Sequence, residues 1–171
     1  MNYTFRLAEL SEVPIIWEIL KHAIKRRKED GSNQWQDGYP NPEVITNDIK
    51  KRVGFVLTIN NHIVGYTAIL INDEPEYNNI KGSWLTNTDF VVFHRIAIAN
   101  THLNKGYAKL ILKNIETYAI KNKIYSIKAD TNFDNNGMLK LFETHNYIYC
   151  GEVYFRGSPR KAFEKVLHIS S

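Results

Sequence analysis

Apolar and polar residues alternate in some segments of the chain and recur at helical spacing in others, which predicts a mixture of strands and helices. Residues 3–7 alternate like a short strand. A helix is predicted to begin at Ser11, whose hydroxyl is a suitable N-cap, because the apolar residues after it recur every three to four positions. The basic run Lys25–Lys28 is interpreted as a solvated helix end. A second, short helix is predicted for residues 41–51, with Pro42 at its first position.

The rest of the pattern is richer in strands. Residues 53–60 and 62–71 are rich in branched and aromatic side chains, and the Asn60-Asn61 pair suits a tight hairpin turn. Further strands are predicted at 90–98, 124–129, 147–153 and 161–168, and further helices at 104–121 and 135–145. The order β-α-α-β-β-β-α-β-α-β-β predicts an α/β fold with a mixed sheet of about seven strands and about four helices on its two faces.

Composition narrows the class of protein but not its chemistry. The chain has 171 residues without a repeat or linker, which predicts a single domain over residues 1–171. It contains no run of eighteen apolar residues, and acidic residues near its beginning replace the apolar stretch of a signal peptide. One cysteine, Cys150, fits a reducing compartment, so we expect a cytoplasmic location. The net charge of +4 does not by itself indicate nucleic-acid binding.

The most informative segment is a predicted strand, turn and helix over residues 94–116. Gly106 and Ala108 are small enough to let a ligand approach the backbone. The N–H groups of a first helical turn lack partners within the helix and carry the positive end of its dipole, which favours a phosphate or pyrophosphate. Lys105 and Lys109 would add positive charge. The alternative is a plain connection in which glycine serves close packing, and the residues leave both interpretations open.

Two better-known phosphate loops are excluded, because the sequence contains neither GxxxxGK[ST] nor a GxGxxG after a strand. The segment instead resembles the pyrophosphate loop of the GNAT family, the acetyl-CoA-dependent N-acyltransferases. That family's Arg/Gln-x-x-Gly-x-Gly/Ala signature follows a strand that ends in an apolar-Ala-apolar triplet. Here the triplet is Ile96-Ala97-Ile98, and the signature reads Leu103-Asn104-Lys105-Gly106-Tyr107-Ala108. Leu103 departs from the pattern, since Arg or Gln normally supplements the backbone cradle.

A second element resembles the family between residues 130 and 147. Asn135 matches the asparagine that hydrogen-bonds the pantetheine arm, although it could also cap the following helix. Phe142 stands where the family usually has tyrosine. The first strand and helix are also similar, so the resemblance spans nearly the whole chain and implies the GNAT fold with acetyl-CoA as acyl donor. The cofactor-binding residues it implies are Ile96, Ala97, Ile98, Leu103, Asn104, Lys105, Gly106, Tyr107, Ala108, Lys109 and Asn135.

In that family an amine attacks the thioester of acetyl-CoA directly in a ternary complex, and a general base helps because free alkylamines are protonated at neutral pH. His94 is the candidate base, because its ordinary pKa suits the task and it precedes the triplet on the same strand. A histidine packed in the sheet or paired with a carboxylate is the equal alternative, and Asp89 and Glu76 are weaker candidates. The resemblance also assigns the backbone N–H of Ile98 to polarising the thioester carbonyl.

The leaving thiolate would be protonated by the tyrosine that Phe142 replaces. Tyr147 is the candidate substitute, with Tyr149 and Tyr154 as alternatives. A thiol has a pKa of about 8.5, so its thiolate leaves fairly well without a proton donor. Cys150 is expected to be a core residue rather than an acetyl carrier.

The acceptor wall is assigned to Trp35 and Tyr39 together with the loop 74–84, where the family varies. Aromatic side chains there could stack on a ring or hold a cation, or they could anchor the loop. No metal is expected, because no ligand spacing relates the remaining histidines, which are His22, His62, His102, His145 and His168.

Three functions are compared. The first is an N-acetyltransferase acting on a primary amine of a small molecule or peptide, and the alternative is a non-catalytic acyl-CoA-binding module, motivated by Leu103 and Phe142. The third, nucleic-acid binding, rests only on net charge and is not expected, nor is a membrane partner. Dimers are common in the family, so a homodimer stays open.

Overall fold

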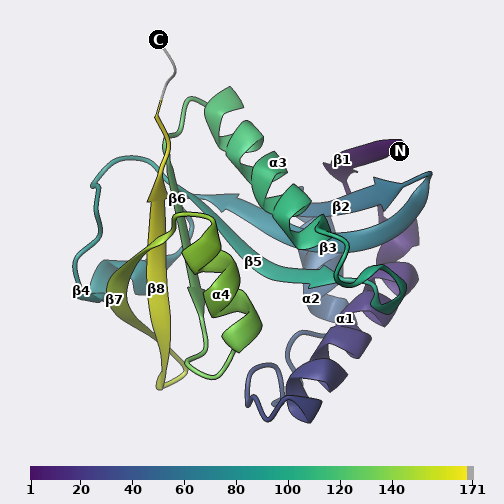
Figure 1. Ribbon diagram of the computed structural model, residues 1–171, viewed down its shortest axis with the longest axis horizontal. Helices are drawn as coiled ribbons and strands as arrows, with labels where there is room; N and C mark the ends of the chain where they lie inside the picture. Colours follow the sequence, from purple (N-terminus) through teal and green to yellow (C-terminus); the bar gives the residue numbers. More distant parts are fainter. Residues whose placement is uncertain (169–171) are drawn as a thin grey trace. The chain divides into compact units, whose positions relative to one another are not determined.

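A computed structural model describes residues 1–168, which fall into two compact units (Figure 1). Unit 1 comprises Met1–Ile69 and His94–Ile115, and unit 2 comprises Leu70–Phe93 and Glu116–Ser171. The predicted single domain extends to residue 171, so its last three residues lie outside the described range, and it stays a prediction.

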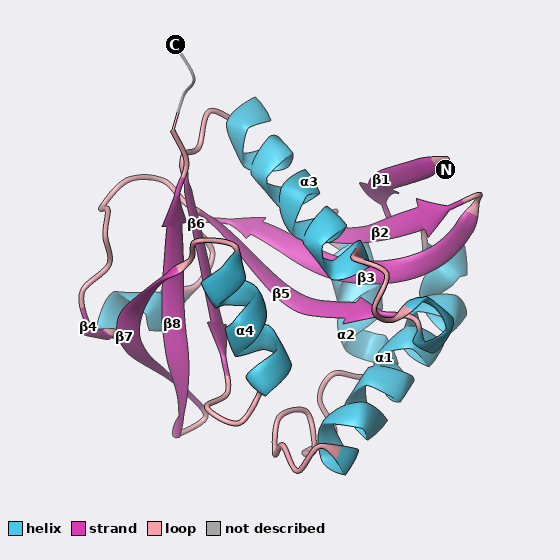
Figure 2. Ribbon diagram, viewed as in Figure 1, coloured by secondary structure: helices cyan, strands magenta, loops and turns pink. Residues whose placement is uncertain are grey.

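Unit 1 holds the first strands and the helices that pack on them (Figure 2). Its strands follow the order β1 (Tyr3–Leu7), β2 (Gly54–Ile59), β3 (His62–Ile71) and the C-terminal part of β5 (Val91–Ile98). β1 and β3 each pair antiparallel with β2. The helices are α1 (Val13–Glu29), α2 (Pro42–Lys50) and the first part of α3 (Tyr107–Lys121).

Unit 2 contains the remaining strands. The first residues of β5 pair in parallel with β6 (Ser126–Thr131), which is followed by β8 (Ser158–Val166), β7 (Ile148–Phe155) and β4 (Lys81–Gly82) in antiparallel pairings. α4 (Asn136–Thr144) completes the unit. The described residues thus form a mixed arrangement of eight strands with four α-helices, which confirms the predicted fold class. The additional strand is β4, a two-residue pairing inside the predicted loop 74–84.

The sheet of unit 1 is covered on both faces. Tyr66 and Ala97 belong to a buried cluster with Ile16, Leu20 and Ile45 of α1 and α2. The neighbouring Gly65 faces the other way, where an added Cβ would lie 2.9 Å from the Ile111 side chain of α3. Because successive strand residues point to opposite faces, α3 covers the face opposite α1 and α2, and glycine at position 65 lets it approach closely.

Unit 2 also has two different faces. Phe142 of α4 is fully buried against Phe163, with ring centroids 4.7 Å apart. The adjacent Ala162 belongs to a separate cluster with Tyr77 and Val153. α4 therefore packs on one face, and the segment that includes the 3-10 helix η2 (Pro75–Asn79) packs on the other.

Local signals account for most element boundaries. The Asn41 side chain accepts the Val44 N–H at 3.0 Å, which confirms the predicted start of α2. Asn60 and Asn61 both have positive φ, as the predicted two-residue hairpin requires. The prediction for Ser11 is wrong: it lies inside a 3-10 turn (η1, Leu10–Glu12), and the Glu12 carboxylate accepts the Glu9 N–H at 2.8 Å instead.

Candidate functional site: a helix N-terminus and a bulged strand

The turn between β5 and α3 contains two residues with left-handed backbone. Asn104 has a φ of 59° and Gly106 a φ of 81°, and α3 begins at the next residue. The Leu110 N–H bonds to the Gly106 carbonyl at 3.0 Å, where the helical ladder begins. The N–H groups of residues 107–109 therefore lie ahead of the ladder and point out of the helix N-terminus.

The surroundings of this N-terminus fit a phosphate group. A Cβ atom added to Gly106 would meet no heavy atom within 4 Å, so space is open at the backbone. Lys105 and Lys109 are exposed on either side of the glycine. Fixed N–H donors, the helix dipole and two exposed cations together suit a pyrophosphate. Leu103 is half-buried and adds no polar group to the cradle.

The beginning of this turn is held by α1. The Arg26 guanidinium donates to the Ile98 carbonyl at 3.0 Å and to the Asn100 side chain. Asn100 belongs to η3 (Asn100–His102), the short 3-10 helix that opens the turn. Two arginines of the basic run are thus structural, and the prediction that the whole run is solvated is wrong for Arg26 and Arg27.

Arg27 lies on the buried stripe of α1. Its guanidinium stacks 3.8 Å from the centroid of the Trp35 ring, and burial lowers the pKa of Arg27 to about 10. The signal was in the spacing, since Arg27 follows Ala23 by four residues and Ala23 follows Leu20 by three, a pattern that continues the apolar face. Lys25 and Lys28 of the same run are exposed, as predicted.

β5 is distorted next to His94. Arg95 has a φ of 58°, a left-handed conformation inside a strand that is rare for a residue with a side chain. It is held there by a buried ion pair with Asp48 of α2, with Nη2 2.7 Å from Oδ1 and Nε 3.0 Å from Oδ2. The Tyr66 hydroxyl also donates to Asp48 at 2.6 Å. Sequence reasoning missed this cluster, because its members are separated by 47 and 18 positions.

His94 lies one residue before this distortion. It is half-buried, and its backbone carbonyl accepts the Thr67 hydroxyl at 3.0 Å. Ile96, Ala97 and Ile98 complete the strand, and the turn to Gly106 follows. In unit 1 the candidate base and the phosphate cradle thus lie on the same strand–turn–helix segment.

The two aromatic candidates for the acceptor wall differ in accessibility. Trp35 is 7% exposed within the unit 1 core, and Arg27 covers its ring. This burial favours the role of loop anchor for Trp35. Tyr39 is half-buried, and its hydroxyl accepts a hydrogen bond from Arg95. Tyr39 therefore links the loop after α1 to the distorted part of β5.

The predicted residues of unit 2 lie around α4. The Asn135 side chain caps the helix by accepting the Met138 N–H at 3.2 Å, which confirms the capping role weighed for it. Tyr147 is 4% exposed, and its hydroxyl is buried without a hydrogen-bond partner among the described residues. Burial, with a smaller effect of Glu116, raises the pKa of Tyr147 well above its ordinary value. Asn135 and Tyr147 belong to unit 2, whereas the cradle belongs to unit 1.

The weaker candidates show less specific surroundings. Glu76 and Asp89 are exposed, and Asp89 accepts a hydrogen bond from the Asn72 amide at 3.0 Å. Tyr149 and Tyr154 are also exposed. Cys150 is buried, and burial raises the pKa of its thiol, which disfavours the reactive thiolate.

The described residues hold neither a cluster of metal ligands nor a helix suited to a membrane. Within residues 1–168, no group of three or more His, Cys, Asp or Glu side chains is arranged to hold a metal ion. No helix in the same range is long and apolar enough to cross a bilayer.

Solved structures resemble the chain over its whole length. A GNAT-family acetyltransferase from Streptococcus agalactiae 2603 is 30% identical with a TM-score of 0.91, and the match covers 99% of this chain and 98% of that chain. A GNAT-family acetyltransferase from Listeria monocytogenes 4b F2365 is 17% identical with a TM-score of 0.77, covering 96% and 95%. The yncA protein of Salmonella typhimurium, solved with its cofactor acetyl-CoA, is 15% identical with a TM-score of 0.69, covering 100% and 97%. The last two likenesses concern the fold alone.

Sequence comparison gives the same result at the level of the family. No curated protein sequence matches the chain. The acetyltransferase (GNAT) family model, however, matches residues 17–147, which include most of α1, the cradle of unit 1 and α4 of unit 2. GNAT enzymes use acetyl-CoA as acyl donor. The chain therefore belongs to the acetyltransferase (GNAT) family.

Proposed function

We propose that the protein transfers the acetyl group of acetyl-CoA to a primary amine of a small molecule or peptide, by direct attack in a ternary complex. The observation that carries this proposal is the open helix N-terminus at Gly106, flanked by Lys105 and Lys109, in a chain of the acetyltransferase family. The open space and the unsatisfied donors there fit the pyrophosphate of coenzyme A. When bound, acetyl-CoA would supply the activated thioester.

The cofactor-binding residues have separate tasks. The N–H groups of residues 107–109 and the two lysines would bind the pyrophosphate. Asn135 would bind the pantetheine arm through the part of its side chain that does not cap α4. By the family resemblance, Ile98 would donate its backbone N–H to the acetyl carbonyl, where negative charge develops as the amine adds.

His94 would take the proton from the attacking amine. An alkylamine with a pKa of about 10.4 costs roughly 4–5 kcal/mol to deprotonate at pH 7, so a nearby base lowers the barrier substantially. The backbone of His94 is fixed by the Thr67 hydrogen bond and by the adjacent Arg95–Asp48 pair. These contacts would hold in one position the backbone from which the imidazole projects.

The Tyr147 hydroxyl is expected to keep its proton during the reaction. Its pKa is raised by burial, so protonating a thiolate of pKa about 8.5 from this hydroxyl is uphill. We therefore assign the departure of coenzyme A to the thiolate itself and keep Tyr147 as the candidate general acid only for a thiolate that comes within hydrogen-bond reach.

The acceptor wall is proposed to include Tyr39 more than Trp35. Tyr39 is partly exposed, and Arg95 positions its hydroxyl. Trp35, in contrast, is buried in the core of unit 1 and has little accessible surface. An amine with an aromatic or cationic group would suit the Tyr39 ring.

A non-catalytic acyl-CoA-binding module is the second candidate. It is favoured by Phe142, which is fully buried and has no hydroxyl, and by the buried hydroxyl of Tyr147. Incubation with acetyl-CoA and a panel of primary amines, followed by detection of free thiol, separates the two functions. Amine-dependent thiol release supports the transferase, whereas tight binding of acetyl-CoA without release on any amine supports the module.

A further inference from the structure

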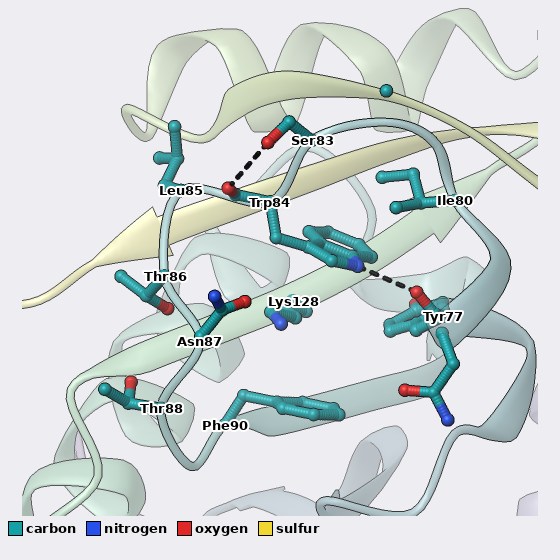
Figure 3. Close-up of a pocket in the computed structure, with 12 residues that line it drawn as sticks. Tyr77, Ile80, Ser83, Trp84, Leu85, Thr86, Asn87, Thr88, Phe90 and Lys128 are labelled. Atoms are coloured by element: carbon teal, nitrogen blue, oxygen red, sulfur yellow. Dashed lines mark hydrogen bonds between the residues drawn. The ribbon is translucent and has the colours of Figure 1, made fainter.

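Unit 2 contains a pocket in the segment after β3, part of which is the loop 74–84 of the predicted acceptor wall (Figure 3). Its volume is about 450 Å³, a size suited to a small-molecule ligand. The segment from Tyr77 to Phe90 forms most of the wall, and Lys128 of β6 forms the floor. Among the described residues that line the pocket, Lys128 alone carries a charge.

Lys128 is an unusual lysine because it is 4% exposed. Its ammonium nitrogen lies 4.5 Å from the Trp84 ring centroid and 4.3 Å from the Phe90 ring centroid, between the two rings in Figure 3. Within residues 1–168, no hydrogen bond or ion pair engages this nitrogen. Burial lowers the pKa of Lys128, which reflects the cost of keeping the charge away from water.

Glu164 is the carboxylate opposite Lys128 in the β6–β8 register, yet it serves other partners. It is fully buried and accepts the backbone N–H groups of Leu85 at 2.6 Å and Thr86 at 3.1 Å. The hydroxyls of Thr86 and Ser126 donate to its other oxygen, each at 2.7 Å. The hydrogen-bonding capacity of the carboxylate is thus used to hold the loop, and the donors of Lys128 are left facing the pocket.

The aromatic side chains of the wall are fixed by hydrogen bonds at their polar ends. The Trp84 indole N–H donates to the Tyr77 carbonyl at 2.9 Å, and the Tyr77 hydroxyl donates to Asp130 at 2.6 Å. The polar ends of both rings are therefore satisfied inside the protein. Trp84 and Phe90 present apolar faces on either side of the ammonium group.

From this arrangement we infer that the unit 2 pocket is a binding site for a small monocarboxylate with an aromatic body. The carboxylate would accept the hydrogen bonds that Lys128 offers, and the ring would pack against Trp84 or Phe90. A monoanion matches the site better than a phosphate dianion does, because the buried carboxylate of Glu164 next to Lys128 repels every negative charge of the ligand and so disfavours the dianion more. The inference concerns unit 2 alone and holds whether or not the protein transfers acetyl groups.

Benzoate is the probe, and benzamide is its matched neutral control. The full-length protein is labelled with ¹⁵N at the indole of its three tryptophans, and each compound is titrated while the indole signals are followed. We expect saturable shifts of the Trp84 indole with benzoate and an affinity at least about tenfold weaker for benzamide. Equal binding of the two compounds, or no saturable shift with benzoate, overturns the inference. Inorganic phosphate that binds as tightly as benzoate also overturns it.

Lys128→Met tests the residue, because methionine keeps much of the side-chain length and removes the charge. The matched control is Lys121→Met, at the exposed end of α3. We expect Lys128→Met to weaken benzoate binding at least about tenfold and to leave benzamide binding unchanged, with no effect of Lys121→Met. Unchanged benzoate affinity in a folded Lys128→Met variant overturns the inference. If that variant does not fold, the comparison of benzoate with benzamide on the unmodified protein decides the question alone.

Discussion

Gly106 and Gly31 have nearly the same backbone conformation, with φ angles of 81° and 80°. An added Cβ would meet no heavy atom within 4 Å at either position. A side chain at either position therefore introduces a similar strain in the left-handed backbone, of about 1 kcal/mol. Only Gly106 lies at the N-terminus of α3, so the pair separates a backbone effect from an effect on the ligand.

Gly106→Glu is expected to lower the affinity for acetyl-CoA at least about a hundredfold. A carboxylate near the pyrophosphate costs about 4 kcal/mol at 4 Å and an effective dielectric constant of 20. Gly31→Glu should leave the affinity for acetyl-CoA unchanged. Both substitutions should lower the melting temperature by a similar amount. Isothermal titration calorimetry with acetyl-CoA measures both variants. Equal affinities for Gly106→Glu and the unmodified protein would remove the cradle from the proposed site.

His94→Ala is expected to reduce kcat about a hundredfold or more with little change in acetyl-CoA affinity, because a general base acts on the acceptor amine. The rate of the unmodified enzyme should rise with pH as the imidazole loses its proton. Thiol release measured across pH should lose this step in the variant. A variant that keeps the original pH–rate profile would show that another group takes the proton.

At the scale of elements, α2 holds the distorted part of β5 through one ion pair. Asp48 and Arg95 side chains are 9% and 10% exposed, and Tyr39 and Tyr66 add hydrogen bonds to the same pair. A buried pair is costly to break, because removal of one partner leaves the other charge unpaired. Lys25 and Glu29 on α1 form a contrasting pair, with side chains 74% and 60% exposed.

Asp48→Asn is expected to lower the free energy of unfolding by about 3–5 kcal/mol, since it leaves the Arg95 guanidinium buried without its countercharge. Glu29→Gln should change the same quantity by less than about 0.5 kcal/mol. Urea denaturation followed by circular dichroism gives both values. Asp48→Asn should also reduce kcat, because His94 adjoins the distorted segment. A stability loss no greater than that of Glu29→Gln would mean that the ion pair does not hold the strand.

Most elements were predictable because their signals are local. The hairpin at Asn60-Asn61 and the cap at Asn41 each depend on residues within a few positions. The distortion at Arg95 was not predictable, because nothing near it in sequence favours a left-handed conformation. Its partner Asp48 is brought close only by folding. For the same reason, the sequence alone does not indicate that Lys128 and Glu164 lie opposite each other on neighbouring strands.

At the scale of the whole molecule, burial is strong enough to change the acidity of tyrosines in both units. Burial, with a smaller effect of Asp48, raises the pKa of Tyr66 in unit 1. In unit 2, burial raises the pKa of Tyr77 with a contribution from Asp130, and the pKa of Tyr147 with a contribution from Glu116. All three hydroxyls therefore stay protonated in the folded protein at a pH where free tyrosine ionises.

Stability is expected to fall steeply as the pH rises above about 10. An acid whose pKa is raised by folding contributes fully to the free energy of unfolding below its unfolded pKa, and this contribution is lost as the unfolded form ionises. Three such groups therefore lower the free energy of unfolding by up to about 4 kcal/mol per pH unit. Absorbance at the tyrosinate band should show that at least three of the ten tyrosines ionise only with unfolding. Complete ionisation of all ten in the folded protein would contradict the burial of these hydroxyls.

The tether between Glu164 and the loop before β5 has a consequence for how that loop can change. Two of its hydrogen bonds come from the main chain, at Leu85 and Thr86, and therefore do not depend on side-chain identity. We therefore expect exposed neighbouring positions such as Asn87 and Thr88 to tolerate exchange while the loop keeps its path. Proline at 85 or 86 is the exception, since it removes the N–H. The loop thus offers an anchored site for altering ligand preference by mutagenesis without rebuilding the fold.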